Sequence, residues 1–174
     1  NVGIGYGGEI GKYSDASISE TILLNLRCAT LLTNYYIAEL RSQPRAYILN
    51  MGSFSGFAPM PYKSIYAASK AYLYHFSISV GEELHGTGVS VSVAMPGPVK
   101  TNRKVRERIA ASGKGAIISS LEADEAAREI INQMFRRKKV IVPGRLYKML
   151  YAIESVLPYG ILMRMTRNAF KGID

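Results

Sequence analysis

The fold is decided by one stretch of the chain, Asn50-Met-Gly-Ser-Phe-Ser-Gly-Phe-Ala-Pro-Met-Pro-Tyr-Lys-Ser-Ile-Tyr-Ala-Ala-Ser-Lys70. It begins at the end of the apolar run 46–51, which predicts a buried strand because β-forming residues stand between a proline and a glycine. A loop rich in glycine and proline follows, and Ser64 offers a cap for a helix that runs to about Leu84. The stretch therefore predicts a strand, a loop and a helix in direct succession.

Two side chains of that helix and one at the end of the strand form a chemical hypothesis. Tyr66 and Lys70 are four residues apart and share one helix face. A free phenol has a pKa of roughly 10, and an ammonium group nearby lowers it toward the range useful for proton transfer. Ser53 follows the strand, where open α/β sheets bind ligands, and its hydroxyl can hold a substrate oxygen. The trio fits carbonyl reduction with a hydride from a cofactor, although a Tyr-x-x-x-Lys pair alone is common on helices.

The same residues belong to a longer series of motifs. In chain order these are Asn1-Val-Gly3, Asn25, Ser53-x-x-Gly56, Tyr66-x-x-x-Lys70 and Pro96-Gly-Pro-Val-Lys-Thr101. Their order and spacing resemble those of the short-chain dehydrogenase/reductase family, with Val2 where that family usually has alanine. The resemblance covers nearly the whole chain and implies an α/β fold, a Rossmann-like doubly wound parallel sheet with flanking helices. It also implies that residues 1–174 are a single domain, the C-terminal part of such a Rossmann domain.

The resemblance implies a role for each motif residue in an NAD(P)-dependent oxidoreductase. Tyr66 is expected to be the acid–base group, and Lys70 to lower its pKa and bind the nicotinamide ribose. Ser53 is expected to orient the carbonyl or alcohol. Asn25 is expected to distort or cap its helix locally and to hold a water that connects Lys70 to solvent. Cofactor contacts are expected from Asn1, Gly3, Tyr66, Lys70, Pro96, Gly97, Val99 and Thr101, and substrate contacts from Ser53, Phe57, Tyr62 and Tyr66.

The family pattern also includes segments that the chain does not show. None of its sixteen glycines forms a G-x-G-x-x-G between a strand and a helix. We therefore expect a glycine-rich phosphate loop and the first strands to precede residue 1, and a buried strand edge to be exposed without them. The residue that selects between NAD and NADP follows the second strand of this fold, which the chain does not show. The cofactor expected from the resemblance is NADP, with NAD possible.

The apolar loop around Phe57 and Tyr62 favours a hydrophobic ketone or 3-oxoacyl substrate over a sugar. Two other functions stay open: a non-catalytic binding protein on the dinucleotide fold, and a lipid-interacting protein at a membrane surface. By resemblance, the helix at 64–84 and the one before it pair with their copies in a homodimer or homotetramer.

Hydrophobic periodicity predicts further elements on both sides of the central stretch. They are helices at 18–41 and 121–137 and strands at 89–95 and 139–143. By resemblance, the charged and then glycine- and serine-rich segment 102–120 is a mobile substrate-binding loop. Residues 145–174 form a basic amphipathic tail, which Pro158 divides into two helical pieces. The tail either packs over the substrate pocket or a neighbouring subunit, or lies on anionic membranes.

Composition excludes several other classes of protein. The net charge is +9, but the basic residues are scattered and lack interleaved aromatic residues, so nucleic-acid binding is not expected. The single cysteine, Cys28, indicates a reducing compartment and a cytoplasmic location, at most peripheral to a membrane. The chain has only two histidines, and few other potential metal ligands accompany them, so no metal site is expected. No apolar run reaches the roughly 18–20 residues that span a bilayer.

Overall fold

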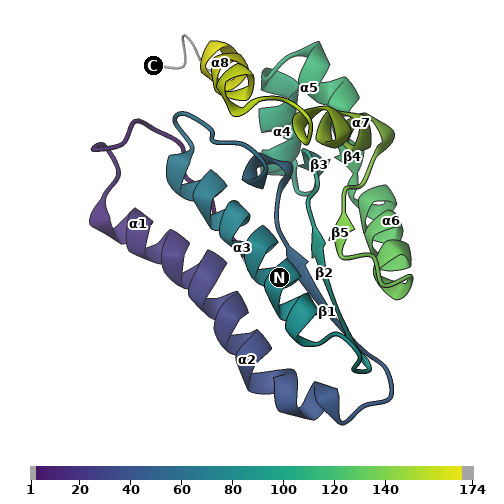
Figure 1. Ribbon diagram of the computed structural model, residues 1–174. Coiled ribbons are helices and arrows are strands. Elements are labelled where there is room, and N and C mark those ends of the chain that lie inside the picture. The colour runs from purple at the N-terminus through teal and green to yellow at the C-terminus, as the bar shows by residue number, and fades with distance from the viewer. Residues whose placement is uncertain (1–2, 170–174) are drawn as a thin grey trace.

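The computed structural model describes residues 3–169, which form a parallel sheet with helices on both of its faces (Figure 1). Its main elements in chain order are α1 (Asp15–Ile22), α2 (Cys28–Arg41), β1 (Ala46–Met51), α3 (Ser64–Glu83), β2 (Val89–Ala94), α6 (Ala123–Phe135), β5 (Val140–Ile141), α7 (Arg145–Glu154) and α8 (Tyr159–Ala169). The short elements are the π-helical turn η1 (Leu23–Arg27), the 3-10 turn η2 (Phe54–Gly56), β3 (Val99–Lys100), α4 (Arg103–Ala111), α5 (Lys114–Ser119) and β4 (Leu121–Glu122).

The sheet has the strand order β1-β2-β5, and both pairings are parallel. Met51 is paired with Ala94, and Ala94 with Ile141, so the three strands end at the same edge of the sheet. β1 forms the outer edge of this sheet on the side away from β5. The loops that follow β1 and β2 therefore leave the sheet side by side, which brings Ser53 and the segment after Ala94 together.

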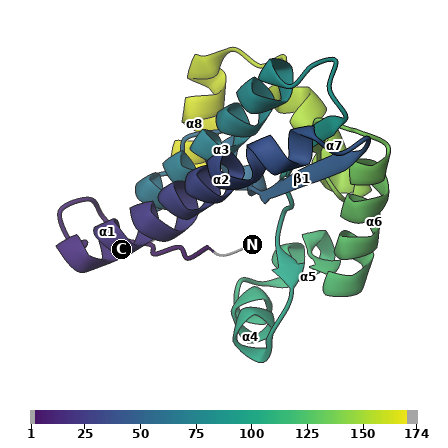
Figure 2. The ribbon, with the colours of Figure 1, turned by 90° about the horizontal axis from the view of Figure 1, so that it is seen from below.

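Alternation along the strands divides the core between the two faces. One face carries Val91 and Val93, which pack with residues of α2, α3 and α7. The opposite face carries Leu49 and Ala94, which pack against α6. Figure 2 shows α2 and α3 on one side of β1 and α6 on the other. The Rossmann-like α/β class with flanking helices is thereby confirmed.

The helix predicted at 18–41 begins earlier, at Asp15, because the Ser14 hydroxyl caps it by accepting a hydrogen bond from Ser17 N at 3.2 Å. It is also interrupted by η1, a π-helical turn that continues directly into α2. A π turn holds one more residue than an α turn, so the side chains after Arg27 are rotated relative to those before Leu23. Several apolar residues of the predicted stripe are about half exposed, both near the start of the turn, as at Leu23, and after it, as at Leu31.

The segment 102–120, expected as a mobile loop, contains two short helices. Asn102 caps α4 by accepting a hydrogen bond from Val105 N at 3.0 Å, and Ile109 is buried beneath it. The ends of the segment are joined by the parallel pair β3–β4, in which Val99 is the partner of Leu121. Figure 2 shows α4 and α5 together as a lobe at one edge of the molecule.

The two helical pieces predicted on either side of Pro158 are α7 and α8. α7 lies against the sheet through Tyr147, which packs with Val93 and Met95. The outward faces of both helices carry exposed apolar residues, among them Met149 of α7 and Met165 of α8, each 55% exposed, and Val156 in the connection between the helices is 78% exposed. Within residues 3–169, no helix combines the length and the apolar character needed to cross a bilayer.

Candidate active site

A cavity of about 440 Å³ lies at the edge where β1 and β2 end. One wall comes from the end of β1 and from α3, a second from the segment after β2, and a third from apolar residues of α6. Its lining residues are Gly3, Met51, Gly52, Ser53, Tyr66, Lys70, Pro96, Gly97, Val99, Thr101, Ala123, Ala126, Ala127 and Ile130. This is the position at which open α/β sheets bind their ligands.

Most of the residues that the sequence predicted as contacts lie in this lining. Three of them do not, namely Asn25, Phe57 and Tyr62, and Asn1 lies outside the described residues. The three lie behind or beside the cavity walls, as described below. The predicted residues thus fall into two groups, those that line the cavity and those that pack outside it.

Lys70 is held in a buried position one helical turn after Tyr66. Only 5% of its surface is exposed, and its Nζ donates a hydrogen bond to Met51 O at 2.9 Å. Nζ also lies 5.8 Å from the centroid of the Tyr66 ring. Burial lowers the pKa of Lys70 below its usual value, since a charged ammonium loses hydration there. The helix thus fixes a cationic group beside a phenol at the bottom of the cavity.

Asn25 lies behind this pair, inside the π turn η1. It is 1% exposed, and its side chain makes hydrogen bonds both to the first described segment of the chain and to α3. Its Oδ1 accepts from Ile4 N at 2.9 Å, and its Nδ2 donates to Ile4 O at 2.8 Å and to Ser69 Oγ at 2.9 Å. Ser69 Oγ in turn donates to Tyr66 O at 2.7 Å. Asn25 therefore joins the segment around Ile4 to the helix turn that carries Tyr66.

Two glycines of that segment lie so close to the site that neither position has room for a side chain. A β-carbon on Gly3 would lie 3.2 Å from both Asn25 Oδ1 and Lys70 Nζ, so Gly3 sits between these two groups. A β-carbon on Gly5 would lie 2.5 Å from Cδ2 of Tyr66, so the tyrosine ring occupies the space that a side chain at Gly5 would need. The sequence analysis missed Gly5. The only signal for it was the density of glycines between residues 3 and 8.

Ser53 stands at the N-terminus of the 3-10 turn η2, where its extended backbone and its side chain cap the turn. Its Oγ accepts hydrogen bonds from Ser55 N at 3.3 Å and from Ser55 Oγ at 2.8 Å. The turn is attached to β2 by two backbone hydrogen bonds of 2.8 Å, from Gly52 N to Ala94 O and from Phe54 N to Pro96 O. Ser53 is consequently fixed between two anchored residues.

Gly97 follows Pro96 in the second wall and packs directly against Tyr147 of α7. A β-carbon at Gly97 would overlap the Tyr147 ring. That ring is buried and lies 4.9 Å from the Phe54 ring, centroid to centroid. α7 thereby supports the wall of the cavity from outside.

Phe57, predicted as a substrate contact, packs away from the cavity in an aromatic cluster. Its ring centroid lies 5.2 Å from that of Tyr74 and 4.5 Å from that of Tyr151. Burial and a hydrogen bond with Tyr151 raise the pKa of Tyr74 to about 12, so its hydroxyl stays neutral. The structure therefore places Phe57 in the packing between α3 and α7.

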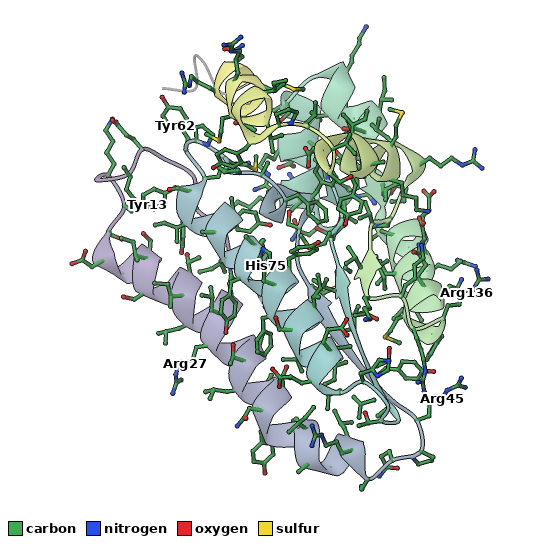
Figure 3. All side chains as sticks on the ribbon, viewed as in Figure 1. Tyr13, Arg27, Arg45, Tyr62, His75 and Arg136 are labelled. Atoms are coloured by element: carbon green, nitrogen blue, oxygen red, sulfur yellow. The ribbon has the colours of Figure 1, made fainter. Side chains whose placement is uncertain are left out.

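Tyr62, the other predicted substrate contact, lies in the loop before α3 with a left-handed backbone, φ 59°. Its carbonyl accepts hydrogen bonds from Gly8 N at 2.7 Å and from the Tyr13 hydroxyl at 3.3 Å. Figure 3 labels Tyr13 and Tyr62 on these two neighbouring loops. This contact ties the loop before α3 to the segment that carries Gly5, at the rim of the site.

A wider open groove of about 1020 Å³ runs along α6, on the surface. Its lining mixes acidic and basic side chains, and two of them, Glu129 and Lys148, form an ion pair. None of the predicted site residues lies in it. Among the described residues, no group of three histidine, cysteine, aspartate or glutamate side chains could hold a metal ion. The predicted site residues that line a cavity therefore all belong to the smaller one.

Comparison with known proteins agrees with this geometry. The family model described as short chain dehydrogenase matches residues 1–112. The ketoacyl reductase HetN of Nostoc sp. (strain PCC 7120) is 29% identical over 167 residues, which cover 92% of this chain and 58% of HetN. The chain therefore spans little more than half the length of this relative.

Two solved structures share the fold. A 7beta-hydroxysteroid dehydrogenase superposes with a TM-score of 0.83 at 18% identity, covering 95% of this chain and 64% of the other. A short-chain dehydrogenase from Sphingobium yanoikuyae in complex with NADPH gives a TM-score of 0.71 at 25% identity, covering 91% and 64%. With the family match over residues 1–112 and the arrangement of Ser53, Tyr66 and Lys70, the chain belongs to the short-chain dehydrogenase family.

Proposed function

We propose that this protein is an NADP-dependent oxidoreductase, with NAD as the alternative cofactor, that transfers a hydride between the nicotinamide and a carbonyl or alcohol. The observation that carries the proposal is the convergence of Ser53, Tyr66 and Lys70 on one cavity at the carboxyl edge of the sheet. The 25% identical Sphingobium relative was solved with NADPH, which supports NADP as the first choice.

The residues around the cavity fit a nicotinamide cofactor. The wall formed by Pro96, Gly97 and Val99 exposes backbone, because Gly97 has no side chain and its neighbour Tyr147 fills the space behind it. On this proposal Val99 meets the carboxamide, Thr101 the pyrophosphate region and Lys70 the ribose. The bound cofactor supplies or accepts the hydride, a reaction for which side chains have no equivalent.

The protein side of the reaction is proton transfer and positioning. In the reducing direction the phenol of Tyr66 gives its proton to the substrate oxygen while a C–H bond forms at the carbonyl carbon. Lys70 places positive charge beside the ring on which negative charge then develops, in a buried position where electrostatic interactions are strong. Ser53 holds the substrate oxygen near the phenol. On this proposal, Asn25 and Ser69 act behind these groups by fixing the turn of α3 that carries Tyr66.

The substrate class that fits best is a hydrophobic ketone or a 3-oxoacyl group. Met51, Val99, Ala126 and Ile130 give the cavity an apolar lining around its few polar groups. HetN, which matches 92% of this chain, is named a ketoacyl reductase, and this name favours the same substrate class.

The test of this function uses the full-length protein with NADPH, or NADH, and a series of hydrophobic ketones and 3-oxoacyl thioesters. Tyr66→Phe should lower turnover by about 100-fold or more, the usual contribution of a general acid, and leave the dissociation constant of the cofactor within twofold. Tyr72→Phe is the matched control, because its hydroxyl bonds to Thr30 Oγ1 on α2, away from the cavity. A fully active Tyr66→Phe enzyme would refute the assignment.

The same experiment addresses the non-catalytic alternative. Saturable cofactor binding with no turnover of any carbonyl would favour a binding protein on this fold. Absence of binding by either dinucleotide would refute the oxidoreductase proposal altogether.

Assembly and location belong to the same proposal. We expect a cytoplasmic homodimer or homotetramer, and the half-exposed apolar residues Leu31 and Leu32 of α2 offer a surface that a second copy would cover. Sedimentation of the full-length protein measures the assembly state, and a monomer at micromolar concentration would contradict it.

A second activity, contact with an anionic membrane surface, is favoured by the outward faces of α7 and α8. Exposed apolar residues stand there at helical spacing beside exposed basic residues. The apolar residues are Met149, Ile153, Ile161 and Met165, and the basic residues are Arg145, Lys148, Arg164 and Arg167. Vesicles with phosphatidylserine should bind the protein, binding should fall with salt, and Ile161→Glu should weaken it. Equal binding to neutral vesicles would contradict this activity.

A further inference from the structure

Ser55 is a polar residue close to the site that does not line the cavity. It is the second residue of η2, partly buried, and both its backbone N–H and its hydroxyl donate to the Oγ of Ser53. The hydroxyl contact, at 2.8 Å, is the shorter of the two. Ser55 can therefore influence a substrate only through Ser53.

We propose that Ser55 is a positioning residue that directs the hydroxyl hydrogen of Ser53 into the cavity. The inference rests on the proposed function and concerns the orientation of its serine. A serine hydroxyl has one hydrogen to donate and two lone pairs to accept. In this structure the two lone pairs of Ser53 Oγ receive the two donors of Ser55, so the hydrogen of Ser53 points away from Ser55. Ser53 is thereby prepared to donate to a substrate carbonyl.

The second hydroxyl also strengthens that donor. When an oxygen accepts a hydrogen bond, its own O–H becomes more polar, and the next bond in the chain is reinforced. A carbonyl oxygen gains negative charge as hydride reaches the carbon, so a more polar donor helps the transition state more than the bound ketone. Ser55 should accordingly affect the rate of hydride transfer more than the binding of substrate.

The backbone of η2 is held rigidly enough for this orientation to persist. Gly52 N and Phe54 N, on either side of Ser53, are both bonded to carbonyls at the end of β2. On the other side of the turn, a β-carbon on Gly56 would lie 2.7 Å from the carbonyl carbon of Lys70, so the turn packs directly against the α3 backbone. Removing the Ser55 hydroxyl should leave this backbone in place.

The experiment compares Ser55→Ala and Ser55→Thr in the full-length enzyme, with Ser42→Ala as a control. The Ser42 hydroxyl also bonds locally, to Glu39 O at 2.7 Å, but on the far end of α2. Single-turnover oxidation of NADPH by a ketone measures hydride transfer. Ser55→Ala should slow it about 3- to 10-fold, the usual worth of one hydrogen bond. Ser55→Thr should restore it, and cofactor affinity should not change. The unfolding midpoint of Ser55→Ala should fall by no more than the loss of one hydrogen bond accounts for.

A second readout separates orientation from a merely structural role. A trifluoromethyl ketone is strongly activated and needs less help from a hydrogen-bond donor, so the defect of Ser55→Ala should shrink on it. A damaged turn would instead slow the reduction of both ketones equally and lower the unfolding midpoint by more than one hydrogen bond accounts for, which would overturn the proposal. So would a wild-type rate for Ser55→Ala on the unactivated ketone.

The failure of this inference can be told from failure of the proposed function. If the wild-type protein reduces a ketone and Tyr66→Phe does not, the function stands, and only the Ser55 variants decide the inference. If the wild-type protein transfers no hydride to any ketone, the proposed function fails and this inference fails with it.

Discussion

Replacing Gly97 with alanine should destabilise the protein, because the Tyr147 ring occupies the space that the new methyl group needs. Three atoms of that ring surround the position of the β-carbon, and even the most distant of them, Cε1, would lie 2.6 Å away. Carbon atoms pack favourably at about 3.5–4.0 Å. The ring or the backbone at Gly97 would therefore have to move by about 1 Å or more.

The surroundings of Tyr147 oppose that movement. The residue is 9% exposed, packs with Val93 and Met95, and meets the Phe54 ring at 4.9 Å. Forcing a methyl group into a packed core costs about 1–3 kcal/mol. Because the obstacle is a buried ring, we expect a loss near the upper end, about 3 kcal/mol. At an m-value of about 2 kcal/mol per M, this lowers the urea midpoint by about 1.5 M.

A double-mutant cycle isolates this contact. Urea unfolding is measured for the wild type, Gly97→Ala, Tyr147→Ala and the double variant. Tyr147→Ala alone should cost about 3–5 kcal/mol, since it leaves a cavity. The added methyl group fits into that cavity, so the double variant should lose about 2–3 kcal/mol less than the sum of the single losses. Additive losses would refute the steric reasoning.

Three further predictions concern other sites. Gly5→Ala pushes a methyl group against the Tyr66 ring and should lower kcat at least tenfold with NADPH affinity kept, as steady-state kinetics and cofactor titration can show. Lys70→Met should abolish turnover. Burial lowers the pKa of Lys70, so the wild-type fold is destabilised by the charged ammonium below that pKa and gains stability as pH rises toward 10.5. The variant lacks this group, so its urea midpoint should decline relative to that of the wild type over the same rise in pH. Burial raises the pKa of Glu154 above 4.5, so the stability that its protonated form gives to the wild type is lost as pH rises through that pKa. The urea midpoint of Glu154→Gln should therefore rise relative to that of the wild type between pH 4.5 and 7. A constant difference between the two midpoints would contradict this.

Local pattern was sufficient to predict the centre of the site. The spacing of Tyr66 and Lys70 places both on one helix face wherever the helix packs, because a helix turn has about 3.6 residues. The turn after a parallel strand places Ser53 at the ligand-binding edge for the same kind of local reason. The structure brings these three residues to one cavity.

The supporting residues could not be predicted because their contacts are made between distant segments. The glycine signal near Gly5 gives no hint of the ring that it meets 61 residues later. Phe57 follows Ser53 in an apolar loop, and sequence alone does not tell whether such a ring faces the cavity or the core. Its partner Tyr151 comes from α7, and that contact turns Phe57 toward the core.

The π turn at Leu23–Arg27 gives the chain a fixed length requirement in the middle of a helix. Deleting one residue there would let the backbone close into an ordinary α-helix with a complete set of regular hydrogen bonds. The same deletion would rotate everything on one side of it by about 100° and carry Asn25 away from Ile4 and Ser69. The shorter helix could still pack on the sheet, but it would no longer support the turn of α3 that carries Tyr66. Regular helix geometry therefore favours a chain without the extra residue of the π turn, whereas the proposed activity requires that residue.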